Sequence, residues 1–489
     1  MYLTQLVEGL NCGSVCFEGE EWEREIDGLY MDSREVKEKG LFVCLTGGKA
    51  DGHEFAYQAV QSGAVALVVE RLLPIRVPQI LVPSTRVALP YLASKFYGDP
   101  SAQLKIIGVT GTNGKTTTTH LLAGILRRAG KQVATIGTLG ITYGRKKIET
   151  SLTTPDPIVM QKAYADMVAC GVEYVVEEVS AHALYHKKDS GTYYTACIFT
   201  NLTQDHLDFF KDMESYKSAK ISLFEKDKCD LAIVNADDKV SDEIKKIRIG
   251  SKVTTYGLKE PADCFAVLTD EGLLGQSFVL NLEDDLCRVS LHLTGKHNAY
   301  NALAAATCAY KLGINVPAIA CGLNEVKQVS GRLQFVQTYK GASIFVDFAH
   351  TPDGLKHSLT SLKKHTVGRL ICLFGCGGNR DKGKRPLMGE ETAKLADFSI
   401  LTSDNPRFED PLDIITDIET GVKKHSNKYV IVPNRERAIE YAVSMLQAGD
   451  VLLVAGKGGE ETQEIMGIKY PYNDQDVVRK MVSQANSLR

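Results

Sequence analysis

Residues 108–117, GVTGTNGKTT, combine glycines with a lysine and neighbouring threonines in a pattern that indicates phosphate chemistry. The segment follows an apolar stretch and precedes residues expected to form a helix. Backbone N–H groups of such a turn and the positive end of the helix attract phosphate, a lysine reaches the outer phosphates, and a threonine hydroxyl can bind Mg²⁺. We therefore predict that ATP binds at Gly111, Thr112, Asn113, Gly114, Lys115, Thr116 and Thr117.

The spacing of this loop departs from the standard G-x-x-x-x-G-K-[ST] pattern, because five residues separate Gly108 from Gly114. A glycine-rich stretch alone is often only a tight turn. Here a strand is expected over residues 104–109 and a helix over residues 120–129. Strand, glycines, Lys-Thr and helix together favour nucleotide binding over a plain turn, but they do not indicate the reaction.

Two further strands are followed by groups that bind metals. Glu178 ends the strand expected over residues 174–178, and His206 follows the strand expected over residues 196–200. Beside a phosphate loop, carboxylate and imidazole can hold Mg²⁺ with one or two protein ligands per ion. His206 alone could equally be a hydrogen-bonded structural histidine, but its place beside a nucleotide loop favours the metal role. Histidines without such a setting are interpreted as surface or linker residues: His53, His186 and His365.

Charged, glycine-containing loops follow the expected strands of the last third of the chain. In a parallel sheet such loops lie together at the carboxyl edge, where open α/β sheets bind ligands. The alternative is that they are solvated turns, but a series of loops that each mix glycine with charged residues favours a shared crevice. These loops span residues 349–353, 375–385, 403–407 and 456–460.

Composition limits the class of protein. The chain has 489 residues, 44% of them hydrophobic and 24% charged, which is enough for about three globular domains. A net charge of −3 gives no sign of a nucleic-acid partner. The start lacks a signal peptide and no apolar run is long enough to cross a membrane, so we expect a cytoplasmic protein with no membrane partner. The 12 cysteines are scattered without zinc spacing and are expected to be reduced and mostly buried.

The order of expected elements predicts an α/β fold with three domains. Residues 1–99 form the first and end at a turn-rich GDPS segment, and residues 100–330 alternate strand and helix, which predicts a mostly parallel sheet. A loop at Ser330-Gly331-Arg332 leads into a third α/β domain, residues 331–489.

The motifs, in this order over nearly the whole chain, resemble the Mur ligase family. The resemblance implies an N-terminal domain that binds the UDP end of the substrate, a central P-loop ATPase domain, and a C-terminal Rossmann-like domain that binds an amino acid. Besides the segments above, it rests on residues 32–34 (DSR), 48–52 (GKADG), 153–155 (TTP), 215–220 (SYKSAK), 295–301 (GKHNAYN), 331–332 (GR) and 347–353 (DFAHTPD).

The resemblance also implies a reaction and its catalytic groups. A substrate carboxylate attacks the γ-phosphate of ATP, and an amine then attacks the resulting acyl phosphate to form an amide. Lys115, Arg332 and two Mg²⁺ ions would stabilise the developing charge. Thr116, Glu178 and His206 would serve the metals, and Lys220 aligns with a lysine that carries a CO₂-derived carbamate. From sequence alone, Lys220 would be an ordinary helix-surface lysine. Asn298 and Asn301 would flank the adenine of ATP, and Asp347 and His350 would contact the nucleotide from the third domain.

Residues for the nucleotide-sugar substrate follow from the same resemblance, namely Ser33, Gly48, Lys49, Ala50, Thr153, Thr154, Ser180 and Lys188. Lys188 stands where the family commonly has arginine, so contact with substrate anions would be looser. Other departures are His186, Phe348, Gln334 and Gly459, and none removes a group that the mechanism requires.

The amino acid added is expected to be meso-diaminopimelate, joined to UDP-N-acetylmuramoyl-L-alanyl-D-glutamate for peptidoglycan synthesis. The segment Asp404-Asn405-Pro406-Arg407 resembles that of the family members that add this amino acid. A planar guanidinium can form two hydrogen bonds to the distal carboxylate of the amino acid, and the Glu460 carboxylate would pair with its distal ammonium group. Arg407 could instead be a helix-capping or surface residue. The pocket would be Arg380, Asp404, Asn405, Pro406, Arg407, Gly456 and Glu460.

Three other functions remain open at this point. A ligase of the same type could add L-lysine. A folylpolyglutamate synthetase-like ligase would share the central fold but lack the N-terminal DSR domain and the 404–407 loop. A non-catalytic nucleotide-sensing protein is disfavoured because Lys115, Glu178, His206 and Arg332 are all present. We expect a monomer that binds only small-molecule substrates.

Overall fold

The computed structural model describes residues 1–10, 14–16, 23–47 and 50–487. The chain splits into two compact units, which we describe separately. Unit 1 comprises Met1–Gly108, Lys131–Cys197 and Ala219–Leu231, and unit 2 comprises Val109–Gly130, Ile198–Ser218 and Ala232–Arg489. Strands β6 (Lys105–Thr110), β11 (Tyr194–Phe199) and β12 (Cys229–Asn235) and helix α7 (Met213–Ile221) contribute residues to both units.

Unit 1 begins with a small twisted sheet covered on both faces. Its parallel strands read as continuous apolar runs, such as AVALVV in β4, because helices bury both sides. Helices α1 (Leu3–Val7) and α3 (Thr85–Phe96) pack on one face, and α2 (Ala56–Gln61), preceded by a 3₁₀ turn (Gly52–Phe55), packs on the other. The strand order is β1 (Ser14–Cys16), β5 (Gln79–Leu81), β4 (Ala64–Val69), β3 (Gly40–Val43) and β2 (Gly28–Tyr30).

His53 in this sheet domain is not a surface residue, which corrects the interpretation from sequence. Its side chain is buried, with Nδ1 2.6 Å from the Asp51 carboxylate, and Nε2 accepts the Glu70 backbone N–H at 2.9 Å. The ring can be buried because both of its nitrogens have partners. His365 is also largely covered and lies 3.7 Å from Glu271.

The rest of unit 1 belongs to the central sheet. Strands β10 (Tyr174–Glu178) and β7 (Val133–Gly137) are parallel, and β8 (Gly140–Tyr143) and β9 (Lys146–Ile148) extend β7 as an antiparallel meander. A 3₁₀ turn (Pro100–Gln103) leads into this region, and helices α5 (Pro157–Ala169) and α6 (Ala181–Tyr185) precede and follow β10.

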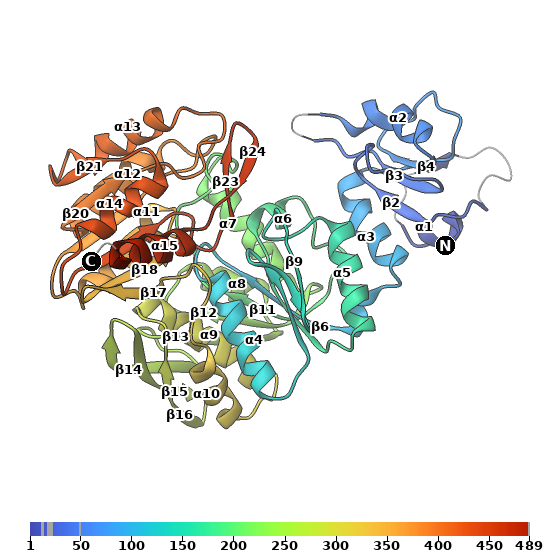
Figure 1. Cartoon of the computed structure of the whole chain (residues 1–489). Helices are drawn as coiled ribbons and strands as arrows, with labels where there is room; N and C mark the ends of the chain where they lie inside the picture. Colours follow the sequence, from blue (N-terminus) through green and yellow to red (C-terminus); the bar gives the residue numbers. More distant parts are fainter. Residues whose placement is uncertain (11–13, 17–22, 48–49, 488–489) are drawn as a thin grey trace. The chain divides into compact units, whose positions relative to one another are not determined.

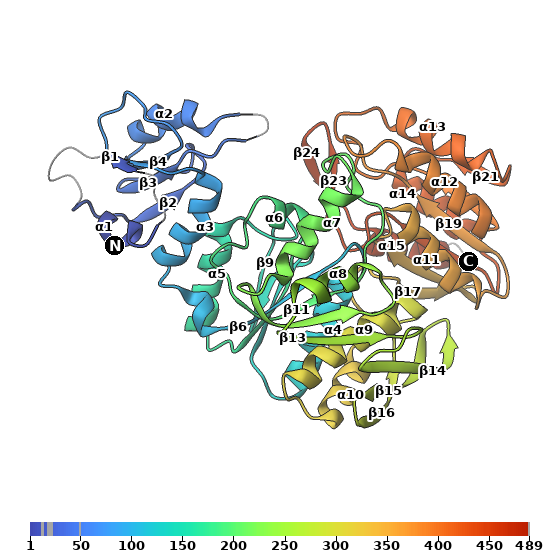
Figure 2. The same ribbon diagram turned by 180° about the vertical axis from the view of Figure 1, so that it is seen from behind.

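Unit 2 begins with a packed group of helices (Figures 1 and 2). Helix α4 (Lys115–Arg128) packs against α9 (Lys296–Lys311) and α10 (Val316–Glu325). A side chain at Gly322 would approach Ile125 Cα within 2.5 Å, so the α4–α10 crossing requires glycine there. Strands β14 (Cys264–Gly272), β15 (Gly275–Leu282) and β16 (Asp285–Leu291) form an antiparallel meander beside β13 (Lys252–Gly257). Helix α8 (Val240–Ile247) follows β12, and a 3₁₀ turn (Ser222–Phe224) follows α7.

The last part of unit 2 is a three-layer lobe, coloured orange to red in Figure 1. Its sheet has the order β17 (Gln334–Tyr339), β18 (Ala342–Asp347), β22 (Val451–Ala455), β19 (Leu370–Phe374), β20 (Phe398–Leu401) and β21 (Tyr429–Ile431), and only the edge pairing β17–β18 is antiparallel among these described strands. Helices α11 (Pro352–Lys363), α12 (Lys384–Leu395) and α13 (Pro411–Val422) bury one face, and α14 (Arg435–Ser444) and α15 (Asp474–Ser487) the other. A hairpin of β23 (Thr462–Ile465) and β24 (Ile468–Pro471) precedes α15.

The predicted α/β fold, with a parallel-rich central sheet and a Rossmann-like lobe, is confirmed. The main difference lies at the phosphate loop, where α4 begins at Lys115 and not near residue 120. Threonines 116–119 have weak helix propensity, but all of them are buried in this helix, so packing outweighs propensity.

A fully buried ion pair joins the two helices on one face of the lobe. Arg435 donates from Nε and Nη2 to the Asp474 carboxylate at 2.8 and 2.7 Å, and from Nη2 to the Ala455 carbonyl at 2.8 Å. Both side chains are 0% exposed.

We expect Asp474→Asn to lower the free energy of unfolding by about 3–5 kcal/mol, because it leaves the buried Arg435 charge without its partner. The control is Glu436→Gln, which removes the exposed pair with Lys480 and should cost less than about 1 kcal/mol. Denaturant unfolding of both variants checks this, and equal stabilities would contradict it.

Candidate active site

Two glycines let the phosphate loop approach its neighbours more closely than any side chain would permit. Gly111 and Gly114 have φ of +145° and +88°. A Cβ on Gly111 would lie 1.8 Å from Thr200 Oγ1, and one on Gly114 would lie 2.3 Å from Asn301 Oδ1. The loop therefore packs directly against the segment after β11 and against helix α9.

The segment after β11 holds the loop by hydrogen bonds. Thr200 Oγ1 donates to the Asn113 carbonyl at 2.6 Å, and Asn113 N donates to Asn201 Oδ1 at 3.0 Å. Thr112 N donates to the Asn201 carbonyl at 2.8 Å. The same segment continues to His206, so the position of the phosphate loop and the course of the chain toward His206 are fixed together.

Lys115, Thr116 and Arg332 lie together at the start of α4, although Arg332 is far away in sequence. Lys115 Nζ donates to the carbonyls of Gly111 and Thr112 at 2.8 and 2.9 Å. Arg332 Nη2 donates to Thr116 Oγ1 at 2.7 Å, and its guanidinium lies 4.4 Å from the Phe348 ring centroid. Cationic groups predicted to stabilise phosphate charge thus meet at one helix N-terminus, where the helix dipole adds to their field.

A charged cluster surrounds His206, which has φ of +56°. Its Nε2 lies 3.3 Å from the Asp205 carboxylate. Burial raises the pKa of Asp205, but His350, His206 and Lys384 lower it by more. Burial, together with Lys384, lowers the pKa of His350 to about 4, so its ring is neutral near pH 7 and Nδ1 donates to the Phe348 carbonyl at 2.8 Å. Neither Asp205 nor Lys384 was predicted as a site residue; the signals were that Asp205 adjoins His206 and that Lys384 lies in the charged loop 375–385.

Asp347 lies at the end of β18, buried beneath α11. Burial raises the pKa of its carboxyl group, and the nearby charge of Arg332 lowers that pKa by less. The Ser358 hydroxyl donates a hydrogen bond to this carboxyl group. Asn298 and Asn301 are buried in α9, where Asn301 Nδ2 donates to Asn298 Oδ1 at 3.0 Å and Thr118 Oγ1 donates to Asn301 Oδ1 at 3.3 Å. The two asparagines therefore lie directly behind the phosphate loop.

Within unit 1, Glu178 belongs to a compact polar network. Its carboxylate accepts Thr138 N at 2.8 Å and Thr138 Oγ1 at 3.1 Å. Thr153 Oγ1 lies 3.3 Å from Thr138 Oγ1, and Thr154 Oγ1 donates to the Glu178 carbonyl at 2.8 Å. Ser180 N donates to Thr154 Oγ1 at 3.0 Å. The structure thus brings together the predicted residues Thr153, Thr154, Ser180 and Glu178; Thr138 was not predicted.

The remaining substrate residues predicted from sequence are more dispersed. Lys188 pairs with Asp156 at 2.6 Å, and Arg86 Nη1 lies 3.4 Å from His186 Nδ1. Burial and the charges of Arg86 and Lys188 lower the pKa of His186. Ser33 is buried and donates to Gln58 Oε1 at 3.2 Å, whereas Ala50 is exposed. Gly48 and Lys49 lie outside the described residues.

Lys220 differs from the sequence interpretation, which placed it on a helix surface. It is only 1% exposed, near the end of α7. The short helix has no simple apolar stripe that would reveal this position, so its burial could not be read from the local pattern.

The donors expected to hold magnesium are a hydroxyl, a carboxylate and an imidazole, on Thr116, Glu178 and His206. Within the described part of the chain, no group of three His, Cys, Asp or Glu side chains is arranged to hold a metal ion. The hydroxyl and carboxylate oxygens fit magnesium, which keeps several waters and is usually held by one or two carboxylates together with substrate phosphates; the imidazole nitrogen is a less typical ligand for it.

The predicted amino-acid loops meet at the carboxyl edge of the C-terminal lobe. Lys457, which is 0% exposed, donates to Asn405 Oδ1 at 2.9 Å and to Glu460 Oε2 at 2.8 Å. Asn405 Nδ2 also donates to Glu460 Oε2 at 2.8 Å. A Cβ on Gly456 would lie 2.5 Å from Asp404 Oδ2, so this loop crossing requires glycine. Lys457 was not predicted, and its side chain joins Asn405 of one loop to Glu460 of another.

Arg407 projects over the glycines that follow β19. Its Nη1 donates to the Gly378 carbonyl at 2.8 Å, and its Nε lies 3.1 Å from Glu464 Oε2. A Cβ on Gly377 would lie 2.9 Å from Arg407 Nη1 and 3.7 Å from Arg380 Cγ, while one on Gly378 would lie 1.9 Å from the Pro406 carbonyl. Arg380 is exposed. The structure therefore brings Arg380, Pro406 and Arg407 to the same glycine pair.

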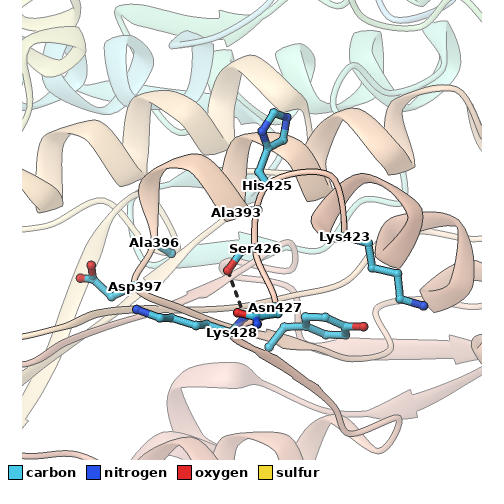
Figure 3. A pocket seen from close by; sticks show the side chains of 9 residues that line it. Ala393, Ala396, Asp397, Lys423, His425, Ser426, Asn427 and Lys428 are labelled. Atoms are coloured by element: carbon cyan, nitrogen blue, oxygen red, sulfur yellow. Dashed lines mark hydrogen bonds between the residues drawn. The ribbon is translucent and has the colours of Figure 1, made fainter.

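A cavity of this lobe, about 690 Å³ in volume, lies elsewhere (Figure 3). Its lining comes from the segments that precede β20 and β21, hence from the amino edge of the sheet, opposite the loops above. Ser426 Oγ accepts the Lys428 backbone N–H there at 3.0 Å. The lining residues are Ala393, Ala396, Asp397, Lys423, His425, Ser426, Asn427, Lys428 and Tyr429.

Comparison with known families agrees with this geometry. The family model for the Mur ligase family catalytic domain matches residues 25–97, that for the Mur ligase middle domain matches residues 109–309, and that for the Mur ligase glutamate ligase domain matches residues 331–458. The chain belongs to the Mur ligase family and has its three-domain fold.

Individual relatives are similar over almost their whole lengths. The chain is 41% identical, over 94% of itself and 95% of the relative, to the UDP-N-acetylmuramoyl-L-alanyl-D-glutamate–2,6-diaminopimelate ligase of Geobacillus thermodenitrificans. It is 40% identical, over 99% of itself and 100% of the relative, to the ligase of the same name from Bacillus velezensis. A solved structure of an enzyme with this name matches with a TM-score of 0.70, 31% identity and 99% coverage of both chains.

A more distant structure shows how far the fold extends. Mycobacterium tuberculosis folylpolyglutamate synthase with ADP and AMPPCP matches with a TM-score of 0.64 at 16% identity, covering 83% of this chain and 95% of that one. At this identity the likeness concerns the fold alone. Among the described residues, no helix combines the length and apolarity that a membrane crossing requires.

We expect Lys115→Ala to reduce ATP-dependent turnover on the order of 10²- to 10³-fold, because the lysine would stabilise phosphate charge in the transition state. Steady-state ADP release measures the effect. Circular dichroism and thermal unfolding must show a retained fold, since Lys115 also binds loop carbonyls, and Lys115→Arg, which keeps charge and donors, should lose less. Normal turnover in folded Lys115→Ala would refute the role.

Proposed function

We propose that this chain is an ATP-dependent ligase that adds meso-2,6-diaminopimelate to UDP-N-acetylmuramoyl-L-alanyl-D-glutamate in peptidoglycan precursor synthesis. The observation that carries this proposal is the meeting of loops at the carboxyl edge of the C-terminal lobe, where the guanidinium of Arg407 and the carboxylate of Glu460 come from neighbouring loops. A second amino-carboxylate on the added amino acid would match this pair of charges. Relatives of nearly equal length that carry this activity in their names support it.

The reaction would proceed in two displacements. An oxygen of the substrate carboxylate attacks the γ-phosphorus of ATP, and the bond to the β,γ-bridging oxygen breaks to release ADP. The amine of the incoming amino acid then attacks the acyl carbon; the C–O bond to phosphate breaks, inorganic phosphate leaves, and the nitrogen loses a proton. Both steps increase negative charge on phosphate oxygens, which preorganised cations stabilise.

Lys115 and Arg332 are the residues that we assign to this stabilisation, because both lie at the start of α4. Bound magnesium would neutralise phosphate charge, and Thr116, Glu178 and His206 would hold it. We assign Asn298 and Asn301 to the adenine side and Asp347 and His350 to the nucleotide from the C-terminal lobe. A neutral His350 can accept or donate one hydrogen bond without adding charge.

The UDP-substrate is assigned to unit 1. Thr153, Thr154 and Ser180 already form one hydrogen-bonded group beside Glu178, which supports a shared binding surface. Lys188 and Ser33 would supply further contacts, with Gly48, Lys49 and Ala50 completing the set carried over from the family. We place the domain boundaries near residues 99 and 330 and the reaction in the cytoplasm, where ATP is available.

Other functions have weaker support. An L-lysine-adding ligase would leave the Arg407 guanidinium without a substrate carboxylate. Folylpolyglutamate synthase shares the fold, but the match to Mur ligase models extends to residues 25–97 at the N-terminus. A non-catalytic sensor would not need Lys115, Thr116 and Arg332 gathered at one helix end.

The direct test is ADP release by the purified chain. Release that requires both the UDP-linked dipeptide and meso-diaminopimelate would support the ligase. Release with folate substrates, or nucleotide binding without any turnover, would instead support the alternatives.

We propose that Lys220 carries a carbamate, which converts a buried amine into a carboxylate. Lys220→Ala should then be nearly inactive, and formate or acetate should restore part of the activity by replacing the missing carboxylate. Turnover is measured with and without the acid. Lys217→Ala in the same helix is the control and should show no such rescue. An active Lys220→Ala variant, or a mass spectrum and density with a bare amine, would refute the carbamate.

We expect kcat/KM for meso-diaminopimelate to exceed that for L-lysine by roughly 10⁴ or more, because lysine has no distal carboxylate to bind the Arg407 guanidinium. Arg407→Ala should reduce this preference strongly, and Arg407→Lys should also reduce it, since an ammonium cannot form the planar two-point contact. Arg479→Ala, at an exposed pair with Asp476, is the control. Comparable values for both amino acids in the unmodified enzyme would overturn the specificity.

A further inference from the structure

The hairpin of β23 and β24 runs along the 404–407 loop and is joined to it by main-chain and side-chain bonds. Arg407 N donates to the Glu464 carbonyl at 3.1 Å, and Met466 N donates to the Arg407 carbonyl at 2.7 Å. Glu464 N donates to Asn405 Oδ1 at 3.0 Å. The hairpin therefore fixes the backbone of the loop that bears Arg407, and Figure 1 shows it in red, next to its lobe.

Glu464 also holds the Arg407 side chain. Its Oε2 lies 3.1 Å from Arg407 Nε, and both side chains are largely covered, with 27% and 21% of their surfaces exposed. On the other side, Nη1 donates to the Gly378 carbonyl at 2.8 Å. The guanidinium is thus held from two directions. Three of its five N–H groups, including both of Nη2, have no hydrogen bond to any residue in the described part of the chain.

The backbone around Arg407 is shaped for this one orientation. Arg407 has φ of +52°, a left-handed conformation that is unfavourable for a side-chain-bearing residue. Gly377 leaves the space in which Nη1 lies, since a Cβ there would be 2.9 Å from it. Strain of this kind persists only where surrounding contacts determine it, and the Glu464 contacts are among those that do.

We propose that Glu464 is a specificity-determining positioning residue, which orients the Arg407 guanidinium so that its remaining N–H groups receive the distal carboxylate of the added amino acid. This inference rests on the proposed function. Glu464 does not touch the reacting atoms. It acts through Arg407, whose long side chain would otherwise lose its rotamer freedom only when substrate binds.

The charge on Glu464 has a second consequence for discrimination. Together with Glu460, it balances the positive charges of the partly covered Arg407 and the buried Lys457, so these loops can accept a zwitterionic end group without a large excess of either sign. A ligand end with an ammonium alone gains no contact from an oriented guanidinium. Glu464 should therefore affect binding of diaminopimelate much more than that of lysine.

The test compares Glu464→Ala with Glu464→Gln in the full chain, using ADP release at saturating ATP and UDP-linked dipeptide. In Glu464→Ala, KM for meso-diaminopimelate should rise roughly 10- to 50-fold, while kcat stays within about threefold of the unmodified enzyme. This is the pattern expected when the lost interaction stabilises the bound substrate and the transition state equally. The value of kcat/KM for L-lysine should stay within about threefold, so the preference falls. Glu464→Gln, whose amide oxygen can still accept the Nε proton but carries no charge, should raise KM for meso-diaminopimelate by less than Glu464→Ala does.

Lys469→Ala is the matched control, because Lys469 lies opposite Glu464 in the register of the hairpin and its side chain is exposed. It should leave the preference unchanged. If Glu464→Ala does not fold, as judged by thermal unfolding, Glu464→Asp replaces it: the shorter carboxylate should weaken the Nε contact and give an intermediate loss of preference.

An unchanged preference in Glu464→Ala, a tighter KM for diaminopimelate, or an equal loss for both amino acids would overturn the positioning role. These outcomes differ from failure of the proposed function, in which the unmodified enzyme would show no diaminopimelate-dependent ADP release. That failure would remove the substrate on which the inference depends and would refute it as well.

Discussion

The buried pair of Arg435 and Asp474 is the interaction on which the C-terminal site depends. An isolated charge cannot remain in such a place, so the two side chains must enter the interior together. Arg435 also donates to the carbonyls of Ala455 and Ser403, which end β22 and follow β20. One guanidinium therefore fixes the strand ends from which the 404–407 and 456–460 loops depart. Because these loops are short and begin at fixed strand ends, Asn405, Lys457 and Glu460 are brought into contact.

The phosphate loop is governed by a different constraint, which is close approach. Gly111 and Gly114 permit the loop to lie against Thr200 and Asn301 without intervening side chains. Such contacts leave the loop little freedom, and its hydrogen bonds to the segment after β11 remove more. Preorganisation of this kind is what binding sites for phosphate require, because the donors must be in place before charge develops.

Much of this arrangement could be predicted from sequence. Buried parallel strands are continuous apolar runs, so β10 was expected with the bounds that it has. The sequence also shows which loops share the carboxyl edge, since strand direction decides that. What local pattern could not reveal were contacts made across long sequence separations. The Arg332–Thr116 bond, the burial of Lys220 and the role of Lys457 depend on tertiary packing, and the burial of His53 depends on partners that no periodicity indicates.

The long separation between Arg435 and Asp474 has a consequence for how the pocket comes into being. Strand β22 and the hairpin that contacts Arg407 are among the later parts of the lobe to leave the ribosome, and helix α15 follows them. The chain must lose the entropy of closing loops of this length before the stabilising contacts between distant residues can form. The amino-acid pocket is therefore expected to be among the last parts of the lobe to form during synthesis. Until then, the loop bearing Arg407 has no scaffold, and a nascent chain would be unable to select its amino acid.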